Sequence, residues 1–244
     1  MTLSGLSASN QNYVKAVWAL GEWSDEPVTA STIAARTGVR LSTASDAIRK
    51  LTDQGYLAHS PYGAVELTDQ GRAAALELLR RHRLIEAFLV QTLGYGLDEV
   101  HAEAEVLEHT VSDLMIRRID DLLGHPSRDP HGDPIPRADG RIEDATYRRL
   151  SSCRVGSAVR VERIADSDPE LVRHLAENGV VFGARLRLLE NVPYSGGIDF
   201  VVESSGDRVS LSRQACEVIR VAPLDDLDEE EGTRAKEKGR HPGP

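Results

Sequence analysis

The chain has 244 residues and a formal net charge of −10, with 40% hydrophobic and 28% charged residues. This length is enough for two or three domains, and the composition is typical of a globular protein. The sequence contains no run of about 18 apolar residues, which excludes a membrane span, and its first residues carry no secretory signal pattern. The two cysteines, Cys153 and Cys216, favour a reducing compartment. We therefore expect a cytoplasmic protein.

Residues 1–74 predict a winged helix-turn-helix domain. Apolar periodicity and capping residues predict helices over residues 12–23, 29–38 and 42–54. Two short strands are expected at 57–60 and 64–68, joined by a turn at Pro61-Tyr62-Gly63. Helix, helix, tight turn, helix and hairpin in this order form a DNA-binding domain.

Residues 75–150 predict a helical domain, and residues 151–223 predict a small β-barrel. A long helix is expected from Asp69 to Leu93 and another over 98–123, followed by a proline-rich loop at 125–136 that cannot be helical. Alternating apolar segments at 158–161, 185–189, 200–202 and 209–211 predict strands, with a short helix at 169–178. Residues 224–244 contain no core formers and predict a disordered tail. The fold class is mainly α with small β parts.

Two predicted helices carry clustered imidazole and carboxylate side chains. At about 100° per residue, four potential ligands fall within a sector of roughly 100° on one helix face. They are His101, Glu105, Glu108 and His109. The preceding helix carries His82 and Glu86 on one face, at a spacing of four residues. If the helices are antiparallel, His109 groups with Glu105 and Glu108, and His101 groups with His82 and Glu86.

This set of ligands predicts divalent metal binding. Imidazole and carboxylate without thiolate suit Mn²⁺ or Fe²⁺. A solvated acidic face that forms ion pairs with nearby arginines explains any one of these residues, and it would make the protein a metal-independent regulator. It gives no reason for six of them together.

The segment Glu105-Val-Leu-Glu108-His109 is similar to a zinc-peptidase pattern, but Glu105 stands at the position where that pattern has its first histidine. A metallohydrolase is therefore a distant alternative.

The third predicted helix carries the candidate DNA-contacting residues. Its small hydroxyl side chains allow close approach to the groove, and its arginines reach phosphate or guanine. The candidates are Arg40, Ser42, Thr43, Ser45, Asp46 and Arg49. Helix capping is the alternative role for Thr43 and Ser45, and an ordinary surface charge is the alternative for Arg49. Because the chain is acidic, we expect DNA binding to depend on metal neutralising the carboxylates.

Three segments together resemble the diphtheria-toxin-repressor family, and most closely the manganese regulators of actinobacteria. They are the segments 81–86, 101–109 and 129–136, within a resemblance that covers about residues 8–222. The resemblance implies a winged helix-turn-helix, a helical metal-binding and dimerisation domain, and a C-terminal SH3-like barrel. It further implies a metal-activated repressor of metal-homeostasis genes that acts as a homodimer on a double-stranded DNA operator. Neither catalysis nor a small organic substrate is expected.

The resemblance also assigns roles to the ligand candidates. The primary site would use Glu105, Glu108 and His109 with Asn12 from the first helix. Iron sensors carry cysteine at the position of Glu105, so glutamate there implies Mn²⁺, with Fe²⁺ as the alternative. Manganese sensors carry aspartate at the position of Asn12, and some carry a second carboxylate at that of Lys15, which cannot serve as a ligand.

A second, ancillary site is implied in each subunit. It would use His82, Glu86 and His101, to which the SH3-like domain adds Asp168 and Glu170.

Overall fold

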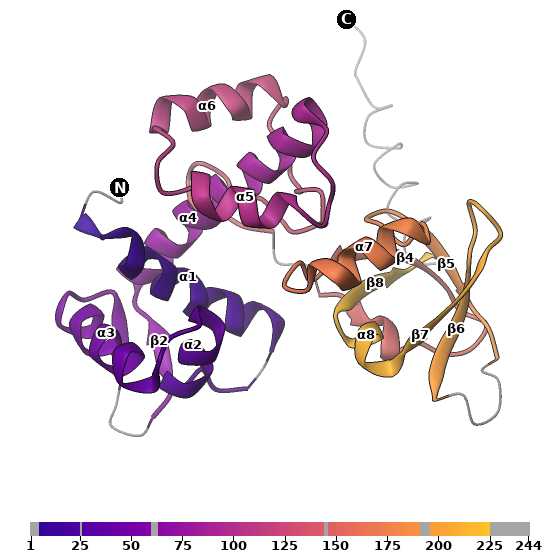
Figure 1. Cartoon of the computed structure of the whole chain (residues 1–244), viewed down its shortest axis with the longest axis horizontal. Coiled ribbons are helices and arrows are strands. Elements are labelled where there is room, and N and C mark those ends of the chain that lie inside the picture. The colour runs from indigo at the N-terminus through magenta and orange to yellow at the C-terminus, as the bar shows by residue number, and fades with distance from the viewer. Residues whose placement is uncertain (1–4, 25, 60–62, 144–145, 191–195, 225–244) are drawn as a thin grey trace, which may run out of the picture. The chain divides into compact units, whose positions relative to one another are not determined.

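The computed structural model describes residues 5–24, 26–59, 63–143, 146–190 and 196–224 (Figure 1). The chain divides into two compact units. One comprises Met1–Ile85, Ala104–Ser127 and Ile135–Glu143, and the other comprises Glu86–Glu103, Arg128–Pro134 and Asp144–Pro244. Among the described helices, none is both long enough and apolar enough to cross a membrane.

The first unit begins with the predicted winged helix. Its elements are α1 (Ala8–Trp23), α2 (Ala30–Thr37), α3 (Leu41–Asp53), β1 (Leu57–His59) and β2 (Val65–Leu67), and the two strands pair antiparallel. Thr29 caps α2 with its side chain, and Gly38 ends that helix with a φ of 69°. Helix α1 starts earlier than expected because Ser7 caps it. Ile33, Ile48 and other apolar residues from all three helices form one core. Pro61 and Tyr62 of the predicted hairpin turn lie outside the described residues.

A long helix leaves the winged helix and carries the ligand candidates. Helix α4 (Asp69–Phe88) starts against the hairpin, where a Cβ on Gly71 would lie 1.9 Å from the Tyr56 carbonyl oxygen. Only glycine allows this close approach of helix and backbone. The helix continues into a π-helical turn, η2 (Leu89–Leu93), so the prediction of a helix from Asp69 to Leu93 is confirmed.

The expectation of one helix over residues 98–123 is wrong. The structure has two helices there, α5 (Val100–Leu107) and α6 (Asp113–Leu122). The second begins at Ser112, whose side chain accepts a hydrogen bond from the Met115 backbone N–H. This cap starts a new helix axis, because a capping residue has extended backbone angles that the interior of a helix does not allow.

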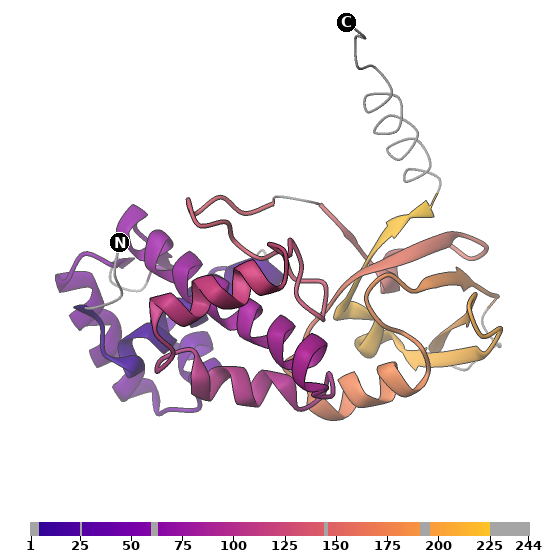
Figure 2. The ribbon, with the colours of Figure 1, turned by 90° about the horizontal axis from the view of Figure 1, so that it is seen from above.

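The second unit contains an antiparallel sheet. Its later strands are orange to yellow in Figure 2. Among the described residues, six strands lie in the order β3-β8-β4-β5-β6-β7. The strands are β3 (Arg148–Arg149), β4 (Ala158–Ile164), β5 (Arg185–Leu188), β6 (Gly197–Val202), β7 (Arg208–Ser212) and β8 (Ile219–Pro223). The other elements are the 3₁₀ turn η3 (Leu150–Ser152), α7 (Pro169–Glu177) and α8 (Arg213–Glu217).

The core of this sheet is built from alternating apolar residues around Phe200, and α7 adds Leu175 to it. The four predicted strands and the short helix are confirmed. The sequence patterns missed β3, β8 and α8. The predicted disordered tail falls almost wholly on residues 225–244, outside the described residues.

Candidate metal centre

Helices α1 and α4 and the C-terminal end of α5 bring four charged or imidazole side chains together in the first unit. Lys15 Nζ donates hydrogen bonds to Glu105 Oε1 and Glu108 Oε2, each at 2.7 Å, and lies 3.1 Å from His82 Nδ1. His82 Nδ1 is also 2.6 Å from Glu108 Oε2. The ligand-type atoms of His82, Glu105 and Glu108 all lie within 4.8 Å of one another. The ammonium of Lys15 therefore contacts all three members of this group.

The orientation of His109 is fixed by Gln11 of α1. The Gln11 amide nitrogen donates to the Leu6 carbonyl at 3.0 Å, so its oxygen faces His109 as an acceptor, 2.7 Å from Nδ1. His109 Nδ1 must therefore carry the proton, and Nε2 of the neutral ring presents a lone pair. That is the form in which imidazole binds metal, with the second nitrogen held by a hydrogen bond.

The His109 lone pair faces the carboxylate of Glu108. His109 Nε2 lies 3.4 Å from Glu108 Oε1, and both atoms are buried without a hydrogen-bond partner among the described residues. Two buried acceptors facing each other are costly unless a cation lies between them. Burial raises the pKa of Glu108, but hydrogen bonds and charge from His82 and Lys15 leave it below its usual value. An ionised carboxylate and an imidazole lone pair fit a divalent metal ion.

On α1 the structure differs from the prediction. Asn12 is exposed, whereas Gln11 is buried and contacts His109. Gln11 and Lys15 are four residues apart and share one helix face, and Asn12 is turned away from that face by about 100°. Gln11 therefore orients a candidate ligand, and its own oxygen is occupied by the His109 N–H.

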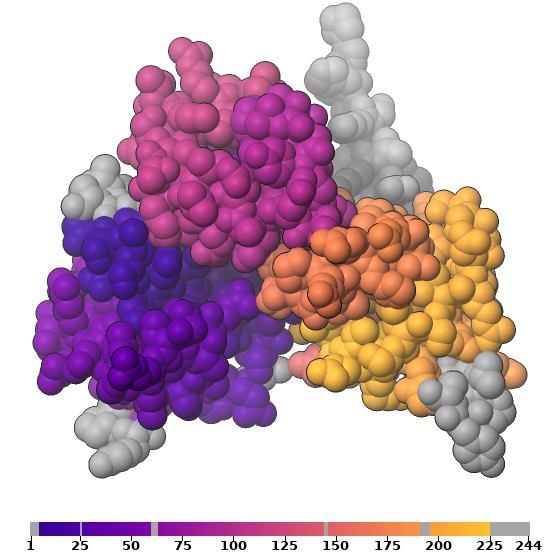
Figure 3. Space-filling model, in the orientation of Figure 1, coloured from indigo at the N-terminus to yellow at the C-terminus, as the bar shows by residue number. Residues whose placement is uncertain are grey.

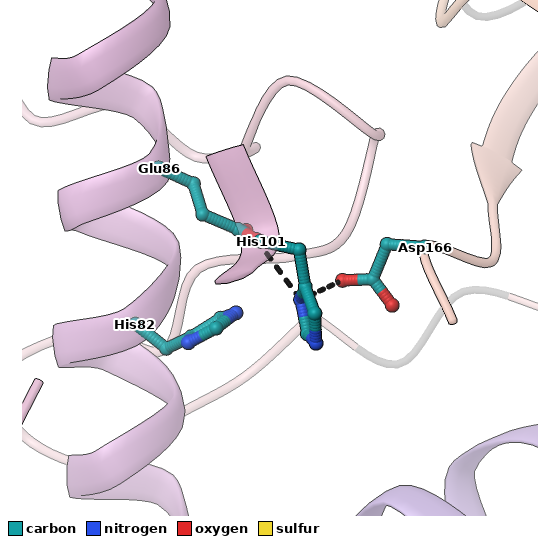
Figure 4. Close-up of side chains that lie close together, drawn as sticks. All are labelled: His82, Glu86, His101 and Asp166. Carbon is teal, nitrogen blue, oxygen red and sulfur yellow. Dashed lines mark hydrogen bonds and ion pairs between the residues drawn. The ribbon is translucent and has the colours of Figure 1, made fainter. Parts of the chain in front are cut away.

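A second cluster of possible ligands surrounds His101. His101 Nδ1 is 3.3 Å from Glu86 Oε1 and 2.8 Å from Asp166 Oδ2 (Figure 4). His82, one turn before Glu86 on α4, is drawn with them and completes a group of four possible ligands. Of the predicted group, Glu86 and His101 are in direct contact, whereas His82 Nδ1 is closest to Glu108 Oε2.

The carboxylate of the β-rich domain that lies beside His101 belongs to neither of the two predicted residues. Asp166, in the segment after β4, is the carboxylate beside His101. The Asp168 side chain instead caps α7 by accepting from the Leu171 N–H at 3.1 Å, and Glu170 is exposed in the first turn of that helix. An aspartate engaged in capping has its carboxylate committed to the helix N-terminus.

The His101 cluster holds a proton in the metal-free chain. Burial lowers the pKa of His101, but hydrogen bonds to Asp166 and Glu86 raise it to about 10. Burial raises the pKa of Asp166, yet the hydrogen bond from His101 holds it well below its usual value. Metal binding to His101 therefore requires the loss of this proton.

This protonation predicts how the stability of the metal-free protein depends on pH. The pKa of His101 is about 10 in the folded protein and 6.5 in the unfolded chain. Its protonation therefore contributes its full stabilisation of the folded state below pH 6.5. That contribution is lost as the pH rises toward 10. Thermal unfolding of chelator-treated protein should show the melting temperature falling over this range. His101→Gln should show a smaller fall, and an identical fall in the variant would contradict this assignment.

The predicted DNA-contacting residues lie on the exposed side of α3 and at its N-cap. Arg40, Ser42, Thr43, Ser45, Asp46 and Arg49 are all exposed. Ala44, Ile48 and Leu51 are buried on the opposite side. The Arg49 guanidinium contacts Asp46 at 3.0 Å, and both side chains are more than 70% exposed. Such a pair is weak in water, so Arg49 remains available to phosphate or base edges.

Comparison with known proteins covers nearly all of the described chain. The family described as iron dependent repressor, N-terminal DNA binding domain, matches residues 5–65. The family described as iron dependent repressor, metal binding and dimerisation domain, matches residues 68–137. The FeoA domain family matches residues 148–223.

Individual relatives agree with these family matches. The iron-dependent repressor IdeR of Mycobacterium tuberculosis is 31% identical, covering 90% of this chain and 99% of the relative. The diphtheria toxin repressor of Corynebacterium diphtheriae is also 31% identical, covering 91% and 100%. A solved manganese-dependent transcriptional repressor in complex with manganese has 49% identity and a TM-score of 0.83, covering 88% of this chain and all of that one. The manganese regulator SloR has 30% identity and a TM-score of 0.72, covering 88% and 98%.

These relatives are transcriptional repressors and not enzymes, which sets the metallohydrolase alternative aside. The fold, the facing imidazole and carboxylate atoms and the three family matches all agree. The chain belongs to the diphtheria-toxin-repressor family of metal-dependent, DNA-binding transcriptional repressors.

Proposed function

We propose that this protein is a homodimeric repressor that binds its DNA operator when Mn²⁺ occupies the centre at Glu105, Glu108 and His109. The observation that carries the proposal is the pair of buried acceptors, His109 Nε2 and Glu108 Oε1, which face each other at 3.4 Å. A divalent ion supplies the positive charge that these two atoms require. The genes that it represses are, by family resemblance, those of metal homeostasis.

Two observations favour Mn²⁺ over Fe²⁺. The candidate donors are carboxylates and imidazoles without thiolate, and hard oxygen donors suit Mn²⁺. The solved manganese-dependent repressor is 49% identical, whereas the iron-dependent repressor of M. tuberculosis is 31% identical. Fe²⁺ remains the alternative ion, because imidazole and carboxylate donors also accept it.

We assign two metal sites to each subunit. The primary site comprises Glu105, Glu108 and His109, with Gln11 as the residue that orients His109. The ancillary site comprises His82, Glu86, His101 and Asp166. Asp166 replaces Asp168 and Glu170 as the ligand from the β-rich domain, since its carboxylate lies 2.8 Å from His101.

The primary site is suited to act as a switch because α1 contributes to it. Lys15 and Gln11 of α1 contact Glu105, Glu108 and His109 on or next to α5. Helix α1 is also part of the winged-helix core through Val14 and Val17. A metal ion that draws Glu108 and His109 together therefore changes what α1 contacts, and through α1 it sets the position of α3. The two recognition helices of a dimer would then match half-sites about one DNA turn apart.

An apolar surface on α5 and α6 suits the second copy of the chain. Its exposed apolar residues are Val106, Leu114, Met115 and Leu122, each 48–67% exposed. Figure 3 shows the α5–α6 segment at the surface of its unit. Large apolar side chains exposed on two successive helices suit a protein interface, and residues 68–137 match the family's dimerisation domain. Leu84 and Leu89 are buried within the single chain and do not belong to this surface.

DNA binding measured with and without metal tests the proposal. Random duplexes selected with the full chain and Mn²⁺ would supply the operator for fluorescence anisotropy. Removing Mn²⁺ with a chelator should weaken binding by about 5–150-fold, the range of ordinary allosteric coupling. Equal affinity after chelation contradicts metal activation. Restoration by anaerobic Fe²⁺ and not by Mn²⁺ would favour the iron alternative.

The assignment of α3 as the recognition helix makes a separate prediction. Arg49→Ala should weaken operator binding about tenfold, and if Arg49 contacts phosphate, the slope of log affinity against log salt should decrease by about one. Arg187→Ala removes an exposed arginine from β5 in the other unit and serves as the control. If both variants bind the operator like wild type, Arg49 has no role in DNA contact.

A further inference from the structure

The loop at 128–134 buries a histidine that neither proposed site uses. His131 Nε2 lies 2.9 Å from the Leu97 carbonyl oxygen, which can only accept, so Nε2 carries a proton. Nδ1 of the neutral ring therefore presents a lone pair. The His131 side chain is 1% exposed, and this Nδ1 has no hydrogen-bond partner among the described residues.

The loop is built to hold the His131 ring in place. Asp129 Oδ1 accepts hydrogen bonds from the backbone N–H groups of His131 at 2.9 Å and Asp133 at 2.8 Å. The His131 carbonyl accepts from the Ile164 N–H of β4 at 3.0 Å. Gly132 has a φ of +90°, and a Cβ there would lie 2.0 Å from the Glu162 carbonyl oxygen. The backbone therefore lies directly against β4, and the ring direction is fixed by it.

His131 Nδ1 is directed at carboxylates. It lies 4.0 Å from Glu86 Oε2, and the ligand atoms of Glu86, Asp129 and His131 all lie within 4.8 Å of one another. All three residues are buried, with at most 4% of their surface exposed. Glu86 uses its other oxygen, Oε1, toward His101 at 3.3 Å. Its two oxygens thus face two different imidazoles.

We propose that Glu86, Asp129 and His131 form a third divalent-cation site, in which Glu86 bridges to the ancillary site around His101. Donors about 2.1 Å from one ion lie at most about 4.2 Å apart. The separation of 4.0 Å between His131 Nδ1 and Glu86 Oε2 fits this limit. Two carboxylates and one imidazole suit a borderline ion such as Mn²⁺. The inference rests on the proposed function only through the shared Glu86.

The charged groups around His131 favour the binding of a cation. Two carboxylates, those of Glu86 and Asp129, lie beside the buried ring of His131. The ring therefore lies in a strongly negative surrounding. A metal ion neutralises both carboxylates at once, whereas a single added proton on the ring leaves one negative charge uncompensated.

Anomalous scattering from crystals of the full chain with Mn²⁺ locates each ion directly. We expect a peak between Glu86, Asp129 and His131, in addition to peaks beside His109 and His101. Peaks at the latter two positions alone overturn the third site and leave the proposed function standing. If no position shows a peak, both fail.

Metal content of variants gives an independent measurement. Asp129→Asn retains the oxygen that accepts the two loop N–H groups and removes only the charge, and His131→Gln removes the imidazole. Equilibrium dialysis with Mn²⁺ should show each variant binding one ion per subunit fewer than wild type. His125→Gln, a change at a histidine that is 70% exposed, is the matched control and should bind as many ions as wild type. Unchanged metal content in both loop variants overturns the proposal.

Discussion

Glu108→Gln should abolish the metal dependence of operator binding. The Glu108 side chain is fully buried, with one oxygen facing His109 and the other contacting Lys15 and His82. Glutamine has nearly the same shape but carries no charge and presents an N–H₂ group, which cannot bind metal. The gain in DNA affinity on adding Mn²⁺, about 5–150-fold in wild type, should fall to about onefold. Fluorescence anisotropy over a Mn²⁺ titration measures it.

Glu103→Gln is the matched control for this experiment. Glu103 lies on the same helix, α5, in its first turn, and the sector of candidate ligands does not include it. This variant should respond to Mn²⁺ like wild type. If Glu108→Gln keeps a full response to Mn²⁺, the centre at Glu108 and His109 is not the activating site.

Lys15→Met should tighten Mn²⁺ binding to the primary site by at least about tenfold, equivalent to about 1.4 kcal/mol. The ammonium contacts Glu105 and Glu108 at 2.7 Å and so competes with a metal ion for the same oxygens. Methionine fills a similar space without the charge. It therefore neither competes with the metal ion for the carboxylate oxygens nor repels that ion electrostatically. Isothermal titration calorimetry gives the dissociation constants.

The same substitution should have the opposite effect on the metal-free protein. Without Lys15 the two carboxylates repel each other and α1 loses its ion pairs with α5, so the chelator-treated variant should melt at a lower temperature than wild type. Lys50→Met, at an exposed lysine of α3, is the control for both measurements. Weaker or unchanged Mn²⁺ binding in Lys15→Met would show that the ammonium does not compete with metal.

The sequence predicted well those features that depend on local periodicity. The i, i+4 spacing of His82 and Glu86, and the spacing of Glu105 from Glu108 and His109, fix which side chains share a helix face. The winged helix followed from caps at Thr29 and Gly38 and from two short apolar strands. These features need no information about distant parts of the chain.

Two side chains that the structure places beside the candidate ligands were not identified from the sequence, because their partners are distant in sequence. Gln11 and Asn12 are chemically alike, and only the packing of α1 against α5 decides that Gln11 faces His109. Asp166 lies in a segment without periodicity, so nothing local distinguishes it. Asp168 carried a usable signal, since aspartate followed by Pro169 is typical of a helix N-cap, and the structure shows it in that role.

The close packing at the start of α4 couples this helix to the winged helix-turn-helix. Gly71 presses the helix onto the Tyr56 carbonyl with no side chain between them, so the hairpin and the first turns of α4 cannot shift independently. Eleven residues separate Gly71 from His82, a helix length of roughly 17 Å. A tilt of α4 by about 3° at His82 therefore displaces the hairpin by roughly 1 Å. We therefore expect a small tilt of α4 on metal binding to move the hairpin together with the helix.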